Sequence, residues 1–114
     1  MPDFVPTIRL SDIPVGQVRA VDVQGTSVAL ARTADGVFAL KDQCSHQDVA
    51  LSEGDVVDCS LECWLHGSAF DLRTGEPLGP PAVTRVPTFE VRTVGESESA
   101  VIHVATEPRT IASP

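Results

Sequence analysis

The sequence predicts an all-β protein, an antiparallel sandwich or barrel. Its apolar stretches are mostly four to seven residues long and rich in Val, Ile, Leu and Phe. Glycine, aspartate and proline separate these stretches, and such residues favour turns between strands. No stretch has the periodicity of an amphipathic helix, and no internal repeat is present. At 114 residues the chain has the size of one domain that can bury a single core without disulfides.

Four strands are expected in the first part of the chain, at residues 7–10, 17–23, 27–32 and 37–40. Residues 11–16 include a proline and a glycine and should turn the chain between the first two strands. Gly25-Thr26 separates the second strand from the third, and Ala34-Asp35-Gly36 supplies a hairpin turn before the fourth.

Further short strands are expected at residues 56–59, around Phe70 and Leu72, at 83–94 and at 100–105. The proline-rich segment 77–81 cannot join a ladder of hydrogen bonds and should form a stiff surface loop. Residues 95–99 form a polar turn between the last two strands. We therefore expect a single domain over residues 1–105 and a flexible tail over residues 106–114.

Two short Cys/His pairs stand out in the middle of the chain. Cys44 and His46 are one residue apart, and after sixteen residues Cys63 and His66 follow with two residues between them. Thiolate and imidazole ligands suit an iron-sulfur cluster or zinc and are poor ligands for calcium or magnesium. The pattern therefore indicates a metal site, with each pair on a loop that a strand holds in place.

This spacing resembles the Rieske family, in which two cysteines bind one iron of a 2Fe-2S cluster and two histidines bind the other. The resemblance extends over roughly residues 21–104 and includes Leu65-His66-Gly67-Ser68, Phe70-Asp71, Arg73-Thr74-Gly75 and the proline segment. It implies a Rieske-type antiparallel β-sandwich with a small cluster-binding subdomain, formed by two loops within residues 42–82. It also implies one cluster per chain, with Cys44 and Cys63 on the inner iron and His46 and His66 on the outer one.

Other residues around the cluster follow from the same resemblance. They are Trp64, Leu65 and Gly67 in the second loop, Ser68 and Phe70 just after it, and Pro80 in the proline loop. High-potential relatives place a serine and a tyrosine hydroxyl near the cluster, and hydrogen bonds to its sulfurs raise the potential. Ser68 is present, but Phe70 occupies the tyrosine position and the chain has no tyrosine. We therefore expect a potential toward the lower end of the Rieske range.

The resemblance implies a one-electron carrier rather than an enzyme. It would pass electrons from a flavin-type reductase to an acceptor such as a non-haem iron oxygenase. The oxygenase itself is excluded, because its iron centre needs two histidines and a carboxylate, and only His103 remains outside the two pairs. The alternative is a zinc-stabilised or Rieske-type interaction module, for example an accessory protein of iron-sulfur cluster assembly.

The formal net charge of −8 excludes nucleic acid as a partner, since phosphate binding needs an excess of Lys and Arg. Residues 42–71 contain seven acids and neither Lys nor Arg. Such a stretch around the cluster would suit redox partners with a basic docking face. We expect the protein itself to be a monomer.

The chain is expected to be soluble and cytoplasmic. Residues 1–14 do not resemble a signal peptide, and no apolar run reaches the length of a membrane helix. With Cys44 and Cys63 bound to metal, Cys59 has no partner for a disulfide, which favours a reducing compartment. We therefore expect neither the membrane anchor nor the bridging cysteine pair that the Rieske subunits of cytochrome bc complexes carry.

Three residues allow a simpler or a functional interpretation. Cys59 is expected to be buried filler within a strand, with a reactive thiol as the alternative. His103 should point to solvent, on the face opposite to Ile102 and Val104. Trp64, the only tryptophan, would either shield the cluster or contact a partner.

Overall fold

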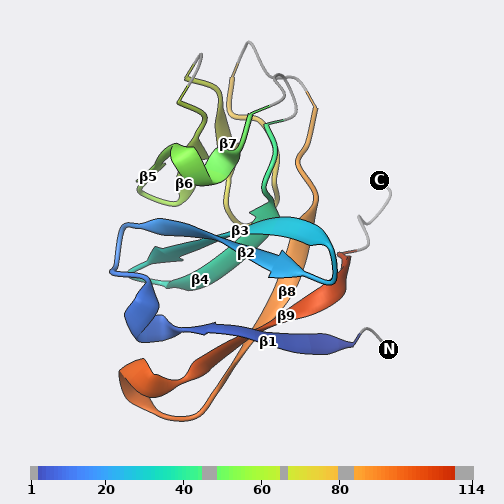
Figure 1. Ribbon diagram of the computed structural model, residues 1–114. Helices are drawn as coiled ribbons and strands as arrows, with labels where there is room; N and C mark the ends of the chain where they lie inside the picture. Colours follow the sequence, from blue (N-terminus) through green and yellow to red (C-terminus); the bar gives the residue numbers. More distant parts are fainter. Residues whose placement is uncertain (1–2, 45–48, 65–66, 80–83, 110–114) are drawn as a thin grey trace.

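A computed structural model describes residues 3–44, 49–64, 67–79 and 84–109, and within them it shows two antiparallel β-sheets (Figure 1). The larger sheet contains β1 (Phe4–Arg9), β2 (Val18–Val23), β3 (Thr26–Thr33), β4 (Gly36–Lys41), β8 (Thr88–Val94) and β9 (Val101–Pro108). The smaller sheet contains β5 (Asp55–Val57), β6 (Ser60–Glu62) and β7 (Ala69–Asp71). The 3-10 turns are η1 (Leu10–Asp12), η2 (Leu51–Glu53) and η3 (Ser97–Ser99), and no α-helix occurs in these ranges.

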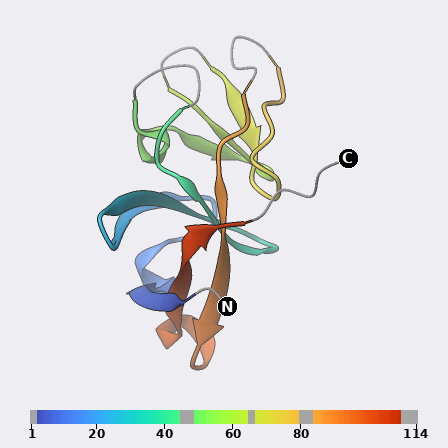
Figure 2. The same cartoon turned by 90° about the vertical axis from the view of Figure 1, so that its right-hand side faces the viewer.

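The strand order of the larger sheet is β1-β9-β8-β4-β3-β2, and every pair is antiparallel. The smaller sheet has the order β5-β6-β7 and is also antiparallel. In Figures 1 and 2 the smaller sheet lies at one end of the molecule and the larger sheet forms the rest. The expected all-β class, with a small separate unit inserted between β4 and β8, is therefore confirmed.

Strand β3 is buried on both of its faces. Val28 and Leu30 pack into a core formed by the larger sheet, together with residues such as Ile102. Ala29 and Ala31 face a second core that joins the larger sheet to the smaller one. Successive side chains of a strand point to opposite faces, so four consecutive buried residues are what a strand between two cores requires. The second core contains Cys44 and Cys63, so the expected ligand thiols are held by the scaffold itself.

The strand expected at residues 56–59 is wrong, because β5 and β6 are two strands joined by a tight turn at Asp58 and Cys59. Asp58 has φ of 53°, a left-handed conformation that aspartate tolerates better than most residues. The Ser60 hydroxyl donates to the Val57 carbonyl at 2.8 Å and reinforces the turn. Cys59 therefore lies in a half-buried turn and is not buried filler inside a strand.

The limits of three other strands also differ from those expected. β1 covers residues 4–9 rather than 7–10, and β8 begins at Thr88 rather than at residue 83. β9 continues to Pro108, three residues into the expected tail, because strands on both of its sides offer partners. Phe4 pairs with Ala105, Phe89 pairs with Pro108, and the Thr106 N–H donates to the Asp3 carbonyl at 2.8 Å. Residues 110–114 lie outside the described residues.

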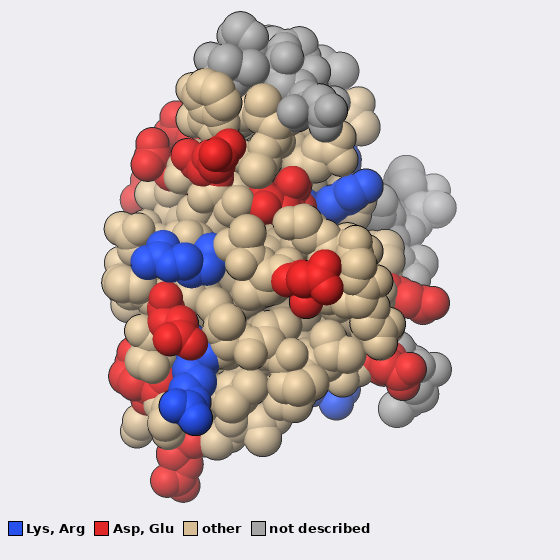
Figure 3. Space-filling model, viewed as in Figure 1, with Lys and Arg blue, Asp and Glu red and all other residues tan. Residues whose placement is uncertain are grey.

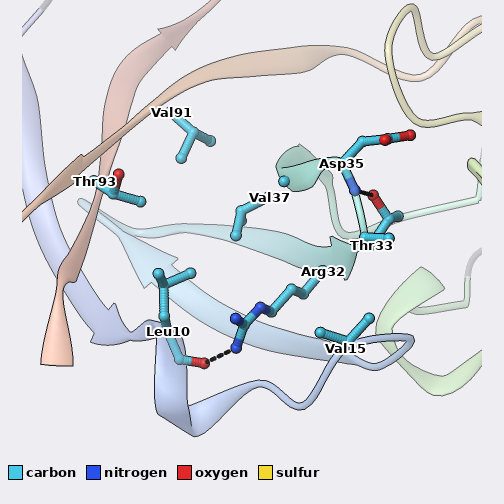
Figure 4. Close-up of a pocket in the computed structure, with 10 residues that line it drawn as sticks. Leu10, Val15, Arg32, Thr33, Asp35, Val37, Val91 and Thr93 are labelled. Atoms are coloured by element: carbon cyan, nitrogen blue, oxygen red, sulfur yellow. Dashed lines mark hydrogen bonds between the residues drawn. The ribbon is translucent and has the colours of Figure 1, made fainter. Parts of the chain in front are cut away.

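Arg32 connects β3 to the turns at the other end of the larger sheet. Its Nη1 donates to the Leu10 carbonyl at 3.0 Å and to the Ile13 carbonyl at 3.1 Å, and Figure 4 shows the first of these bonds beside an open hollow of about 410 Å³. Its two terminal nitrogens also bind the Glu98 carboxylate, at 2.8 and 2.6 Å. The side-chain hydrogen bond raises the pKa of Arg32 and lowers the pKa of Glu98, since each favours the charged form of the other. β3, η1 and η3 are thus fixed to one another.

Candidate metal centre

The two expected ligand cysteines come from different sheets and meet in one core. Cys44 follows β4 of the larger sheet, and Cys63 follows β6 of the smaller sheet. Each is only 2% exposed, and both belong to the same apolar cluster. Neither forms a disulfide, and Cys59 is also a free thiol. His46, His66, Leu65 and Pro80 lie outside the described residues.

Backbone hydrogen bonds close both loops close to their cysteines. The Cys44 N–H donates to the Val49 carbonyl at 2.9 Å. The Cys63 N–H donates to the Ser68 carbonyl at 2.6 Å, and the Gly67 N–H returns to the Cys63 carbonyl at 3.1 Å. Gly67 has φ of 72°, a conformation in which glycine is strongly favoured. The ends of both loops are therefore set by the fold, as the sequence predicts for a ligand site.

Asp42 anchors the first loop, a role that the sequence analysis missed. Its carboxylate accepts hydrogen bonds from the Ser52 N–H and the Ser52 hydroxyl, both at 2.7 Å, and from the Ser27 hydroxyl at 3.2 Å. These contacts hold the start of the loop against β3 and η2. In the sequence, an acid directly before a cysteine loop cannot be told apart from an ordinary surface charge. Its hydrogen-bond donors are distant in the chain, so the sequence does not predict them.

The turn after β7 supports the segment that leads into the proline loop. The Asp71 carboxylate accepts the N–H groups of Arg73 and Thr74, at 2.7 and 3.3 Å. Gly75 has φ of 77°, and a Cβ there would collide with the carbonyl of Val86. Only glycine fits such a close approach of two backbones, so the predicted turn Arg73-Thr74-Gly75 has a structural reason.

The start of the proline segment is tied to the fold. Pro77 forms an isolated antiparallel bridge with Phe70, although we expected this segment to stay outside any ladder. The bridge avoids the missing N–H of proline because the neighbouring residue supplies the donor: the Leu78 N–H binds the Ala69 carbonyl at 2.8 Å. Residues 80–83 lie outside the described residues.

Ser68 provides a test of whether the site fits a cluster. It is 1% exposed, and within the described part of the protein its Oγ has no hydrogen-bond partner. A buried hydroxyl without a partner costs free energy. The backbone carbonyl of the same residue accepts the Cys63 N–H, so Ser68 lies next to an expected ligand of the cluster. Two buried thiols and a hydroxyl that needs an acceptor fit an iron-sulfur cluster, whose sulfurs accept hydrogen bonds. Phe70, fully buried, offers no second hydroxyl.

Trp64, directly after Cys63, is 52% exposed, and Leu78 in the proline segment is 59% exposed. Large apolar side chains beside a site and open to solvent are typical of contact surfaces. The exposure of Trp64 argues against a role in plain core packing. His103 lies on the face opposite to the buried Ile102 and Val104, as predicted. It is half-buried rather than open to solvent, between Pro6 of β1 and Arg92 of β8.

The seven acids of residues 42–71 do not form one uniform surface. Asp42 and Asp71 accept hydrogen bonds from the protein itself. Glu53, Asp55 and Asp58 are exposed, and we call these three the acidic face. They lie in and beside β5, and Figure 3 shows acidic side chains gathered over the smaller sheet, at the upper left.

Outside the residues left undescribed, no group of three or more His, Cys, Asp or Glu side chains lies close enough to hold a metal ion. Within the same ranges, the structure has no helix with the length and apolar character needed to span a bilayer.

Comparisons with known proteins agree with this geometry. Residues 3–90 match the family described as the Rieske [2Fe-2S] domain. The ferredoxin component of the naphthalene 1,2-dioxygenase system of Pseudomonas aeruginosa is 30% identical over 93 residues, which cover 82% of this chain and 89% of that protein.

Two solved structures are similar over almost their whole length. The ferredoxin of carbazole 1,9a-dioxygenase from Nocardioides aromaticivorans IC177 gives a TM-score of 0.84 at 33% identity, covering 91% of this chain and 98% of that one. A chain from the complex of reduced oxygenase and oxidized ferredoxin in carbazole 1,9a-dioxygenase gives a TM-score of 0.82 at 32% identity, covering 95% and 97%. These matches confirm the 2Fe-2S cofactor and replace the zinc alternative. The chain belongs to the Rieske [2Fe-2S] domain family.

Proposed function

We propose that this protein is the ferredoxin component of an oxygenase system. It accepts one electron at a time from a flavin-type reductase and passes it to a non-haem iron oxygenase. The observation that carries the proposal is the match, over nearly the full length of both chains, to a chain of a ferredoxin and oxygenase complex. The ferredoxin component of the naphthalene 1,2-dioxygenase system supports it. The substrate of the oxygenase is not encoded in this chain, because an electron carrier does not touch it.

Within this proposal Cys44 and Cys63 hold one iron of the cluster, and His46 and His66 hold the other. The bound cluster supplies reversible one-electron chemistry. The burial of both thiols and the backbone closure of both loops support this set of ligands. The chain contributes a fixed, largely water-free position for the cysteines and a buried hydroxyl at Ser68. Such a rigid site suits electron transfer, because little must rearrange when one electron arrives or leaves.

The partners would dock at the end of the molecule that carries the two loops. Trp64 and Leu78 offer apolar contact area there, and tryptophan is a frequent hot-spot residue in interfaces. The acidic face adds attraction for a basic surface, which increases the rate of encounter at low ionic strength. We infer that the protein works as a monomer in the reducing cytoplasm, and the free thiol of Cys59, which has no disulfide partner, supports that compartment.

Single-turnover electron transfer tests the proposal. The protein is reconstituted with iron and sulfide, reduced with dithionite, freed from excess reductant and mixed with the oxidized oxygenase component of carbazole 1,9a-dioxygenase. After mixing, we expect the visible spectrum of the oxygenase to change from that of the oxidized form to that of the reduced form. The size of the change should correspond to one electron delivered per ferredoxin. A fully reduced, intact ferredoxin that delivers no electron to this oxygenase, or to the naphthalene 1,2-dioxygenase oxygenase, would contradict the proposal.

A further inference from the structure

A small pocket lies directly beside Cys44. It has a volume of about 170 Å³ and is lined by Lys41, Gln43, Cys44, Arg85, Val86 and Pro87. Two of these residues are cations, although acids outnumber bases by sixteen to eight in this chain. The pocket therefore brings two basic side chains next to an expected ligand of the cluster.

Lys41 is the only lysine in the sequence; the other seven basic residues are arginines. It is the last residue of β4, and its N–H donates to the Pro87 carbonyl at 2.9 Å, which fixes its backbone at the edge of the pocket. The residue is exposed, and among the described parts of the chain its ammonium group forms no ion pair. It is therefore open to an anion that arrives from outside.

Arg85 is held in place on the other side. Its Nη2 binds the Glu76 carboxylate at 2.6 Å, and its side chain is 30% exposed. A guanidinium has five N–H donors, and the structure assigns one of them to Glu76. Because Arg85 is oriented before any partner arrives, less conformational entropy is lost when it binds a second acceptor.

We propose that Lys41 and Arg85 form a carboxylate-binding pocket, and that its occupant is an aspartate or glutamate side chain of the redox partner. The inference rests on the proposed function for the identity of that partner. A pocket of this size suits a carboxylate on a short stem, and arginine and lysine are the side chains that recognise this group. The acidic face lies in and beside β5, and the pocket lies beside Cys44 at the end of β4. Contacts of opposite charge at these two places would favour one orientation of a docked partner.

Occupation of the pocket would be linked to the redox state. Reduction adds one negative charge close to Cys44, so a carboxylate in the pocket binds the oxidized protein more tightly than the reduced protein. If the added charge lies about 10 Å from the carboxylate and the effective dielectric constant is near 20, the affinities of the carboxylate for the oxidized and the reduced protein differ on the order of tenfold. By linkage, bound carboxylate lowers the midpoint potential, and a tenfold preference corresponds to about 59 mV for one electron. A docked partner would thus make the reduced cluster a stronger electron donor.

Acetate serves as the probe for the pocket itself. The midpoint potential of the reconstituted protein is measured at pH 7 with increasing acetate, and chloride keeps the ionic strength constant. We expect the wild-type potential to fall as acetate rises. Lys41→Gln should lose most of this response, and Lys41→Arg, which keeps the charge, should retain it. Arg9→Gln is the matched control, since it removes one exposed cation from the end of β1, which Figure 1 places away from the two loops.

Electron transfer to the oxygenase component of carbazole 1,9a-dioxygenase tests the occupant. Lys41→Gln should raise the ferredoxin concentration needed for half-maximal transfer severalfold and change the limiting rate less, while Arg9→Gln should match the wild type. If wild-type protein transfers no electrons to this oxygenase or to that of the naphthalene 1,2-dioxygenase system, the proposed function fails and the acetate response alone decides the pocket. Equal acetate responses in wild type and Lys41→Gln would overturn the pocket. A third outcome is that acetate lowers the wild-type potential, but Lys41→Gln needs the same ferredoxin concentration as the wild type for half-maximal electron transfer. This result would overturn the partner carboxylate as the occupant and leave a site for small anions only.

Discussion

The backbone N–H of Cys63 donates to the carbonyl of Ser68 at 2.6 Å, and this bond places the buried Ser68 hydroxyl at the base of the second loop. That hydroxyl has no partner in the described part of the protein. The bond thus joins an expected iron ligand to a donor whose acceptor the bound cluster would provide.

Replacement of Ser68 by alanine should lower the midpoint potential, because a hydrogen bond to a cluster sulfur stabilises the reduced state. The same substitution should leave the stability of the cluster-free protein unchanged or raise it by about 1 kcal/mol, since an unpaired buried hydroxyl is removed. Protein-film voltammetry and chemical denaturation provide the two values. Ser60→Ala, whose hydroxyl is bound to Val57 instead, is the control and should keep the potential. An unchanged potential in Ser68→Ala would show that the hydroxyl does not serve the cluster.

Asp42→Asn should destabilise the protein by about 1–3 kcal/mol, because an amide can no longer accept all three hydrogen bonds from Ser27 and Ser52. Urea denaturation of the cluster-free protein measures the change. Asp55→Asn removes an equal charge from the exposed acidic face and should shift the stability by less than about 0.5 kcal/mol. Equal effects of the two substitutions would mean that Asp42 acts through charge alone and does not anchor the loop.

The Arg32–Glu98 pair predicts a pH dependence of stability. The pKa of Glu98 is lowered in the folded protein by its hydrogen bond to Arg32. Its contribution is therefore complete above the pKa of the unfolded state and is lost as pH falls through the lower folded pKa. The difference in melting temperature between wild type and Glu98→Gln should be largest near neutral pH and shrink in acid.

Glu96→Gln, two residues away, serves as the control for the loss of a carboxylate, because, among the described residues, Glu96 forms no ion pair with Arg32. The raised pKa of Arg32 does not affect this experiment, because the contribution of Arg32 to stability is lost only in strong alkali, outside the neutral-to-acid range that is measured. A Glu98→Gln difference that stays constant between neutral and acidic pH would rule out the ion pair as its source.

Steering by the acidic face should make reduction of the protein by a flavin reductase depend on salt. The rate should fall clearly between low and physiological ionic strength, since screening shortens the range of the attraction. A variant with Glu53→Gln, Asp55→Asn and Asp58→Asn should be slower at low salt and much less sensitive to added salt. Asparagine tolerates the left-handed conformation of Asp58, so the turn is preserved. Equal salt dependence in both proteins would leave the acidic face as ordinary solvated surface.

The sequence was sufficient for the parts of the fold in which pattern and turn chemistry agree. The strands at β2, β3 and β4 carry apolar runs bounded by Gly25 and by Asp35-Gly36, so their positions were predicted to within a residue or two. The turn at Asp58 and Cys59 was missed because it contains neither glycine nor proline. The continuation of β9 through Thr106 depends on partners in β1 and β8, and no local signal marks such distant pairs.

At the site, the ligand residues could be predicted because their chemistry and spacing are unusual. The residues that hold the ligand loops in place could not be predicted. Asp42 receives its hydrogen bonds from Ser27 and Ser52, which are distant in the chain. Lys41 and Arg85 come together only because the segment 84–87 lies against the end of β4. Contacts of this kind depend on the tertiary fold and leave no trace in residue spacing.

The most direct test compares three cysteine variants after reconstitution with iron and sulfide. Iron, acid-labile sulfide, zinc and the EPR spectrum of the reduced protein are measured for wild type, Cys44→Ser, Cys63→Ser and Cys59→Ser. We predict about two irons and two sulfides per chain and a Rieske-type signal in wild type and Cys59→Ser, and loss of both in the other two variants. Wild-type protein that binds zinc without sulfide, or a cluster that survives in Cys44→Ser and Cys63→Ser, would contradict the account.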